Sequence, residues 1–94
     1  MIVRLMGEGQ WRVDDSLRER LDELDAETER AVEAGDEEAL HAALRALHDA
    51  VRSAGEKLDH ADLTASDAVI PPDDLDLDEA RALLAGEDLF PDLV

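Results

Sequence analysis

Apolar residues recur at spacings of three and four positions along two stretches between residues 16 and 55. On a helix with about 3.6 residues per turn, each set falls on one stripe, which predicts two amphipathic helices. The first stripe contains Leu17, Leu21, Leu24, Thr28, Ala31 and Val32, and the second contains Leu40, Ala43, Leu44, Leu47, Val51 and Ala54. Because only a short joint separates the stripes, we expect the helices to form an antiparallel hairpin over 16–55.

Residues at the ends of the two stripes predict where the helices begin and end. Ser16 followed by Glu19 matches a capping box at the start of the first helix. Gly35 can adopt the left-handed conformation that ends a helix, and Asp36 can cap the amino end of the next helix. Gly55 is expected to end the second helix.

The first thirteen residues show strand-forming character on either side of a glycine-rich turn. Residues 1–6 are apolar apart from Arg4, and residues 10–13 alternate between polar and apolar side chains. With a turn at Gly7-Glu8-Gly9, this pattern predicts a β-hairpin over 1–13. A three-residue loop at that position would place Leu5 opposite Trp11 on one face and Arg4 opposite Arg12 on the other.

Residues 56–94 show weaker patterns. We expect a surface connection with one turn of helix over 56–67, and then a short edge strand at 68–70 that Pro71 and Pro72 stop. Asp76 and Glu79 resemble a second capping box. The helix that follows would end at Gly86 and would bury Leu77, Ala80, Leu83 and Leu84, and the apolar tail contains Leu89, Phe90, Leu93 and Val94.

These elements predict one domain of the α+β class over residues 1–94. It would consist of an N-terminal β-hairpin (1–13), an antiparallel helical hairpin (16–55), and a closing segment (56–94) with a short third strand and a C-terminal helix. A chain of this length supports a single small core. No apolar run is long enough for a transmembrane helix, and no signal-peptide pattern is expected at the amino end.

The composition is strongly acidic. The 94 residues contain 26 acidic and 9 basic residues, giving a formal charge of −17, and no cysteine. A surface of this charge repels phosphates and anionic lipid head groups, so direct nucleic-acid binding and direct membrane insertion are not expected. The charge is uneven, because residues 1–13 carry Arg4 and Arg12 against Glu8 alone, whereas 58–94 carry Arg81 as the sole basic residue.

The acidic residues Asp74, Asp76 and Asp78 alternate as at the start of a calcium loop. The position after Asp78 should be glycine but is Glu79, and the twelfth position should be glutamate but is Ala85. Acidic residues at a helix start are ordinary complements to the helix dipole, which is the interpretation that we favour.

Three histidines are the other candidate metal ligands. His41 and His48 are seven residues apart, so they share one side of the second helix, and His60 is a conceivable third ligand. Zinc-binding helices usually place their ligands four apart, so we favour surface or boundary histidines, which can pair with Glu or Asp. The serines lack the glycines of a nucleophile elbow, and the 7–9 turn is too short for a phosphate loop. The sequence therefore predicts no catalytic residue, no cofactor and no metal.

The residues with the character of a protein-binding surface lie in the first hairpin. Strand alternation places Ile2, Arg4, Met6 and Arg12 on the face that should look outward. Trp11 is a further candidate because tryptophan and arginine are enriched at binding hot spots, although we favour a core position for it. The expected occupant of this face is a second copy of the chain, forming a homodimer, or another protein.

Two segments resemble the PspA-associated family PspAA. They are Met-Ile-Val-Arg-Leu-Met-Gly-Glu-Gly-Gln-Trp-Arg-Val at 1–13 and Leu-Thr-Ala-Ser-Asp-Ala-Val-Ile-Pro-Pro at 63–72, followed by the Leu-Asp-Glu-Ala-Arg-Ala-Leu-Leu helix at 77–84. The resemblance implies a non-enzymatic accessory of a PspA-like coiled-coil, membrane-remodelling protein in the envelope-stress (phage-shock) response. It also implies a cytoplasmic location, with membrane association through that partner, and it supplies no catalytic or ligand residues.

Two other classes of function remain open on the residues alone. One is a small metal-dependent enzyme, which rests on His41 and His48. The other is an acidic mimic of nucleic acid that occupies a basic groove, which rests on the net charge.

Overall fold

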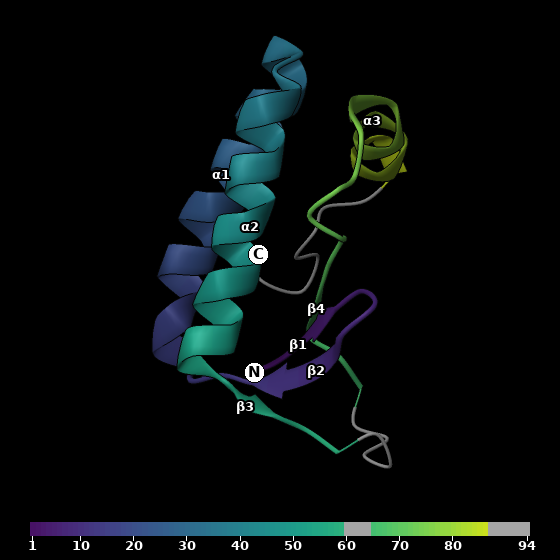
Figure 1. The fold of residues 1–94 in the computed structure, drawn as a ribbon. Helices are drawn as coiled ribbons and strands as arrows, with labels where there is room; N and C mark the ends of the chain where they lie inside the picture. The colour runs from purple at the N-terminus through teal and green to yellow at the C-terminus, as the bar shows by residue number, and fades with distance from the viewer. Residues whose placement is uncertain (60–64, 87–94) are drawn as a thin grey trace.

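The computed structural model describes residues 1–59 and 65–86, and it confirms the α+β class (Figure 1). Along the chain the elements are β1 (Ile2–Leu5), β2 (Gly9–Arg12), a 3-10 turn (Asp15–Leu17), α1 (Arg18–Ala34), α2 (Glu37–Ala54), β3 (Glu56–Lys57), β4 (Ala68–Ile70) and α3 (Leu77–Gly86). The helical pair α1 and α2 rises from one side of the sheet, and α3 lies beside it on that same side (Figure 1).

The strands form one sheet in the order β3-β2-β1-β4. β1 pairs antiparallel with β2 and parallel with β4, and β3 pairs antiparallel with β2. The predicted edge strand before Pro71 is therefore confirmed. The expectation of a helical turn after Gly55 is wrong at residues 56–57, which form β3, and residues 60–64 of that connection lie outside the described part of the chain.

The register of the first hairpin differs from the prediction by two residues. Arg4 is opposite Gln10, and Val3 is opposite Trp11. The loop is residues 6–8 rather than 7–9, because the Glu8 N–H donates to the Leu5 carbonyl at 2.9 Å and closes the turn there. The shift leaves every side chain on its predicted face, but Arg4 and Arg12 become diagonal neighbours, which avoids two like charges directly opposed.

The predicted helical hairpin is confirmed, with one change at its start. Gly35 adopts a left-handed conformation with φ of 68°, and the Asp36 carboxylate accepts from the Ala39 N–H at 3.0 Å. Ser16 is not a cap, because the Asp14 carboxylate accepts from the Ser16 N–H and begins a 3-10 turn that precedes α1. This hydrogen bond lowers the pKa of Asp14.

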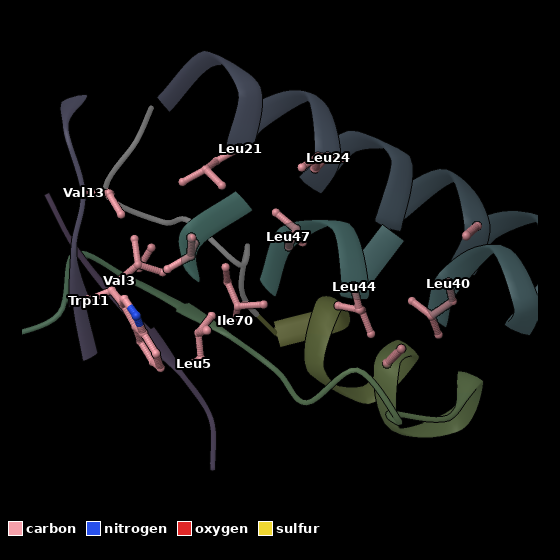
Figure 2. Close-up of a cluster of buried hydrophobic side chains, with 14 of the residues drawn as sticks. Val3, Leu5, Trp11, Val13, Leu21, Leu24, Leu40, Leu44, Leu47 and Ile70 are labelled. Carbon is pink, nitrogen blue, oxygen red and sulfur yellow. The ribbon is translucent and has the colours of Figure 1, made fainter. Parts of the chain in front are cut away.

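The hydrophobic core lies between the sheet and the two long helices (Figure 2). Leu40, Leu44 and Leu47 of α2 are 0% exposed. Leu47 lies toward Val3 and Ile70 of the sheet, with Leu21 and Leu24 of α1 on its other side, whereas Leu40 and Leu44 lie toward α3 (Figure 2). The stripes of spacing three and four therefore mark buried faces, as predicted, except at the end of the second stripe, where Ala54 is exposed.

The helix α3 begins at the predicted cap. The Asp76 carboxylate accepts from the Glu79 N–H at 2.8 Å, and this hydrogen bond lowers the pKa of Asp76. The Asp76 side chain, in turn, raises the pKa of Glu79. Ala80 is 1% exposed and joins the core, whereas the Leu83 and Leu84 side chains and the tail from Leu89 lie outside what the structure describes. Within the described residues, no helix is long and apolar enough to cross a bilayer.

Candidate functional site

The side of the sheet opposite the helices carries the candidate binding surface. Because side chains alternate along a strand, β1 directs Val3 and Leu5 to the core and Arg4 to the opposite side. The parallel register places Val69 of β4 beside Arg4. We call four exposed residues of this side the outer face: they are Arg4, Met6, Arg12 and Val69. The exposed Glu56, which pairs with Arg12 in the register, lies on the same side.

Exposed apolar side chains gather on the outer face. Met6 is 45% exposed and Val69 is 39% exposed, and among the described residues they are the large hydrophobic side chains that reach this level. Met6, in the turn that follows β1, lies beside β4, since the Met6 N–H donates to the Ile70 carbonyl at 3.0 Å. Isolated exposed hydrophobic residues are ordinary, but a pair on one sheet face is a candidate contact surface.

The outer face is also positively charged. Arg4 and Arg12 are exposed, and neither forms an ion pair with another residue of the described part of the chain. Arg12 lies opposite Glu56 in the register, yet this pair is not within ion-pair distance. Two guanidinium groups therefore remain available for carboxylates of another molecule, in a chain with a net charge of −17.

Two of the five predicted contact residues, Ile2 and Trp11, are buried rather than exposed on this surface. Ile2 shares the face of Arg12 in the register, but the expectation that it is exposed there is wrong, because it is 8% exposed. Its strand is central, between β2 and β4, and its N–H donates to the Asp67 carboxylate at 2.7 Å, so neighbours on both sides cover it. Trp11 is 6% exposed in the core, as we favoured, with the Lys57 ammonium 5.2 Å from its ring centroid.

The histidines of α2 contact oxygen atoms of other segments. His48 Nδ1 is 3.0 Å from Glu8 Oε2, an acidic partner as expected, but the expectation of a surface or boundary position is wrong for His48, which is 2% exposed. His41 Nε2 is 2.9 Å from the carbonyl oxygen of Leu75, ahead of α3. His60 lies outside the described residues, and within those described no group of three potential ligands is positioned to hold a metal ion.

A groove of about 440 Å³ opens between the ends of α1 and α2 near Gly35. Its walls are mostly alanine, with charged side chains at the rim: Glu27, Arg30, Ala31, Ala34, Asp36, Ala39, Ala42 and Ala43. The Asp36 carboxylate already caps α2. The groove offers shape but no arrangement of acid, base or nucleophile.

Comparison with known protein families gives one result. The family described as PspA-associated protein, PspAA, matches residues 1–92. The chain belongs to the PspAA family. The match covers every element of the fold, including the strands that build the outer face. No curated protein and no solved structure matches the chain.

Within this PspAA chain, sequence reasoning missed one residue of the outer face. Val69 was recognised as part of a strand, but its direction depends on which residue of β1 it pairs with. The parallel pairing of Val69 with Arg4 could not be inferred from alternation in a three-residue strand. The sequence does indicate that this strand lies at an edge of the sheet, because two prolines follow it directly.

Proposed function

We propose that this PspAA chain is a non-enzymatic accessory protein that binds a PspA-like coiled-coil protein in the envelope-stress response. The observation that supports it most directly is the family match, together with an outer face that combines exposed apolar side chains with arginines that form no ion pair among the described residues. In this proposal the chain acts in the cytoplasm and reaches the membrane through its partner.

The outer face is the contact surface in this proposal. Met6 and Val69 supply apolar area, and Arg4 and Arg12 supply planar donors that bind carboxylates in pairs. The surface of a coiled coil carries acidic and basic residues in alternation at the positions beside its seam. Its acidic residues can pair with the two arginines, and its basic residues can face the acidic remainder of this chain, which speeds encounter.

Charge favours a different protein over a second copy as the occupant. A two-fold dimer uses the same patch on both subunits. If two outer faces met across an axis near Arg4, the guanidinium groups of Arg4 and Arg12 would face the same groups of the other copy. Such like-charge contacts oppose association, whereas a partner with acidic residues at this position removes the conflict.

The test is a charge reversal with a matched control. We expect Arg4→Glu/Arg12→Glu to weaken binding to the purified PspA-like protein by about tenfold or more, as for loss of hot-spot residues. The control is Arg18→Glu/Arg45→Glu, which changes the net charge equally at exposed helix positions that form no ion pair with described residues. Isothermal titration calorimetry measures the affinity, and circular dichroism verifies the fold.

Equal affinities for the two variants would show that the outer face is not the contact surface. Sedimentation of the wild type and both variants decides the competing occupant. A wild-type dimer that the Arg4/Arg12 variant dissociates, without any binding of the PspA-like protein, would replace this proposal by homodimerisation.

A further inference from the structure

Exposed side chains on the outer side of the sheet follow a fixed order from one edge to the other. Glu56 of β3 is opposite Arg12 of β2 in the register. Arg4 of β1 is opposite Gln10, two residues before Arg12, so the two arginines are diagonal neighbours. Val69 of β4 is beside Arg4. From the β3 edge to the β4 edge, the exposed groups are therefore acidic, basic, basic and apolar.

The chain itself covers other residues on this side of the sheet. Ile2 and Gln10 are each 8% exposed. The Gln10 side-chain amide donates to Ser66 Oγ at 2.7 Å, and the Ile2 N–H donates to the Asp67 carboxylate at 2.7 Å. Because β1 separates β2 from β4, the contact between Gln10 and Ser66 crosses β1 on its outer side. The outer face remains exposed beside this cover, so its side chains are the ones that a partner can contact.

The spacing of Arg12, Arg4 and Val69 matches successive turns of an α-helix. Diagonal neighbours on an antiparallel pair are about 7–8 Å apart, and adjacent strands are about 4.8 Å apart. Along a helix, positions i and i+4 are separated by about 6 Å, and positions i+4 and i+7 by about 4.5 Å. These three positions also lie on one side of a helix. A helix laid across the sheet can therefore oppose Arg12, Arg4 and Val69 in turn.

We infer that the outer face recognises a helix with carboxylates at positions i and i+4 and an apolar side chain at i+7. Each guanidinium is permanently charged and can bind one carboxylate with two parallel hydrogen bonds. The apolar side chain meets Val69 together with Met6, whose N–H donates to the Ile70 carbonyl of β4. This inference deepens the proposed function, on which it rests for the identity of the partner, by naming the kind of segment that the partner presents.

Glu56 adds discrimination to this recognition. It lies beyond Arg12, at the position that a side chain one turn before i would approach. A further carboxylate there would meet a like charge, whereas a basic residue would meet an opposite one. The outer face should therefore reject a helix that is acidic along its whole length, although such a helix has the higher negative charge.

The probe is a labelled synthetic peptide that is stapled on its far side, because short helices are marginally stable in water. It carries Glu at i and i+4 and Leu at i+7. The matched control peptide has the same composition, with the second Glu moved to i+2, which points away from the first. Fluorescence anisotropy at about 0.15 M salt measures both affinities, since this ionic strength screens long-range attraction.

We expect the wild type to bind the i, i+4 peptide at least about tenfold more tightly than the control peptide, the difference that one lost hot-spot contact produces. In Arg4→Glu/Arg12→Glu the preference should reverse in sign, so that a peptide with Lys at i and i+4 binds instead. Arg18→Glu/Arg45→Glu has the same net charge and should keep the wild-type preference. Circular dichroism verifies that each variant is folded.

A double-mutant cycle tests the apolar contact. Val69→Thr keeps a β-branched side chain in β4 and replaces one methyl group by a hydroxyl. If Val69 contacts the Leu of the peptide, Val69→Thr should weaken binding of the Leu peptide and have little effect on a peptide with Ala at i+7.

Equal affinities for the two spacings, no binding of either peptide, or the same reversal in Arg18→Glu/Arg45→Glu would overturn the inference. The intact PspA-like protein separates this result from the proposed function. If that protein binds through the arginines while the peptides show no preference for spacing, the inference fails and the proposed function stands. If the peptides show the preference and the PspA-like protein does not bind, the proposed function fails and the recognition of an acidic helix stands.

Discussion

Replacement of Leu44 by alanine tests whether the buried face of α2 dominates stability. Leu44 is 0% exposed and belongs to the core cluster, where it lies toward α3 (Figure 2). The change removes three carbon atoms, which corresponds to about 2.4 kcal/mol of lost transfer free energy before the cavity is counted. With the cavity, we expect a loss of about 3–5 kcal/mol in the free energy of unfolding. In a domain of this size, that is a fall of about 12 °C or more in Tm.

Urea denaturation followed by circular dichroism measures this loss, with Met6→Ala as the control. Met6 is apolar but 45% exposed, so its truncation should change the free energy of unfolding by less than about 0.5 kcal/mol. An unchanged slope against urea would show that both variants unfold from a similar native state. Unfolding midpoints for Leu44→Ala and Met6→Ala that agree within error would refute the reasoning, because burial would then not determine the cost.

Two further predictions concern charge and close packing. Tm should rise from low to molar sodium chloride, because salt screens the repulsion among the carboxylates of a chain with a net charge of −17. Thermal scans that show a constant or falling Tm would reject this repulsion as the leading salt-sensitive contribution to stability. Gly55→Ala should lower Tm, because an added Cβ would lie 2.7 Å from the Val51 carbonyl oxygen and 2.8 Å from Val13 Cγ1. A Tm equal to that of the wild type would show that this contact relaxes without cost.

The helical hairpin could be predicted because its signals are local. The stripe on α2 repeats over five turns, and the glycine and aspartate between the helices each have a single geometric role there. The start of α1 differs from the prediction, because Asp14 rather than Ser16 caps this short segment. A side chain that caps a 3-10 turn gives the same sequence signal as one that caps the helix itself.

The outer face could be predicted only in part, because its geometry depends on pairing between distant segments. Alternation correctly placed Arg4 and Arg12 on one side of the hairpin. The burial of Ile2 required β4 and Asp67, which are more than sixty residues away in the chain. The contacts of His48 likewise join residues 40 and 23 positions apart. Periodicity describes one element at a time, so it carries no information on such contacts.

The positive charge of the outer face is the observation that supports a binding partner. A two-layer domain leaves one side of its sheet uncovered by helices, and polar residues on that side are ordinary. In a chain with 26 acidic and 9 basic residues, however, an ordinary solvated face would be expected to carry mostly carboxylates. Here β1 and the end of β2 present Arg4 and Arg12 beside Met6 and Val69. Carboxylates elsewhere on the chain suffice for solubility, and in the described residues neither arginine forms an ion pair, which supports the proposal that this face contacts an acidic surface of a partner.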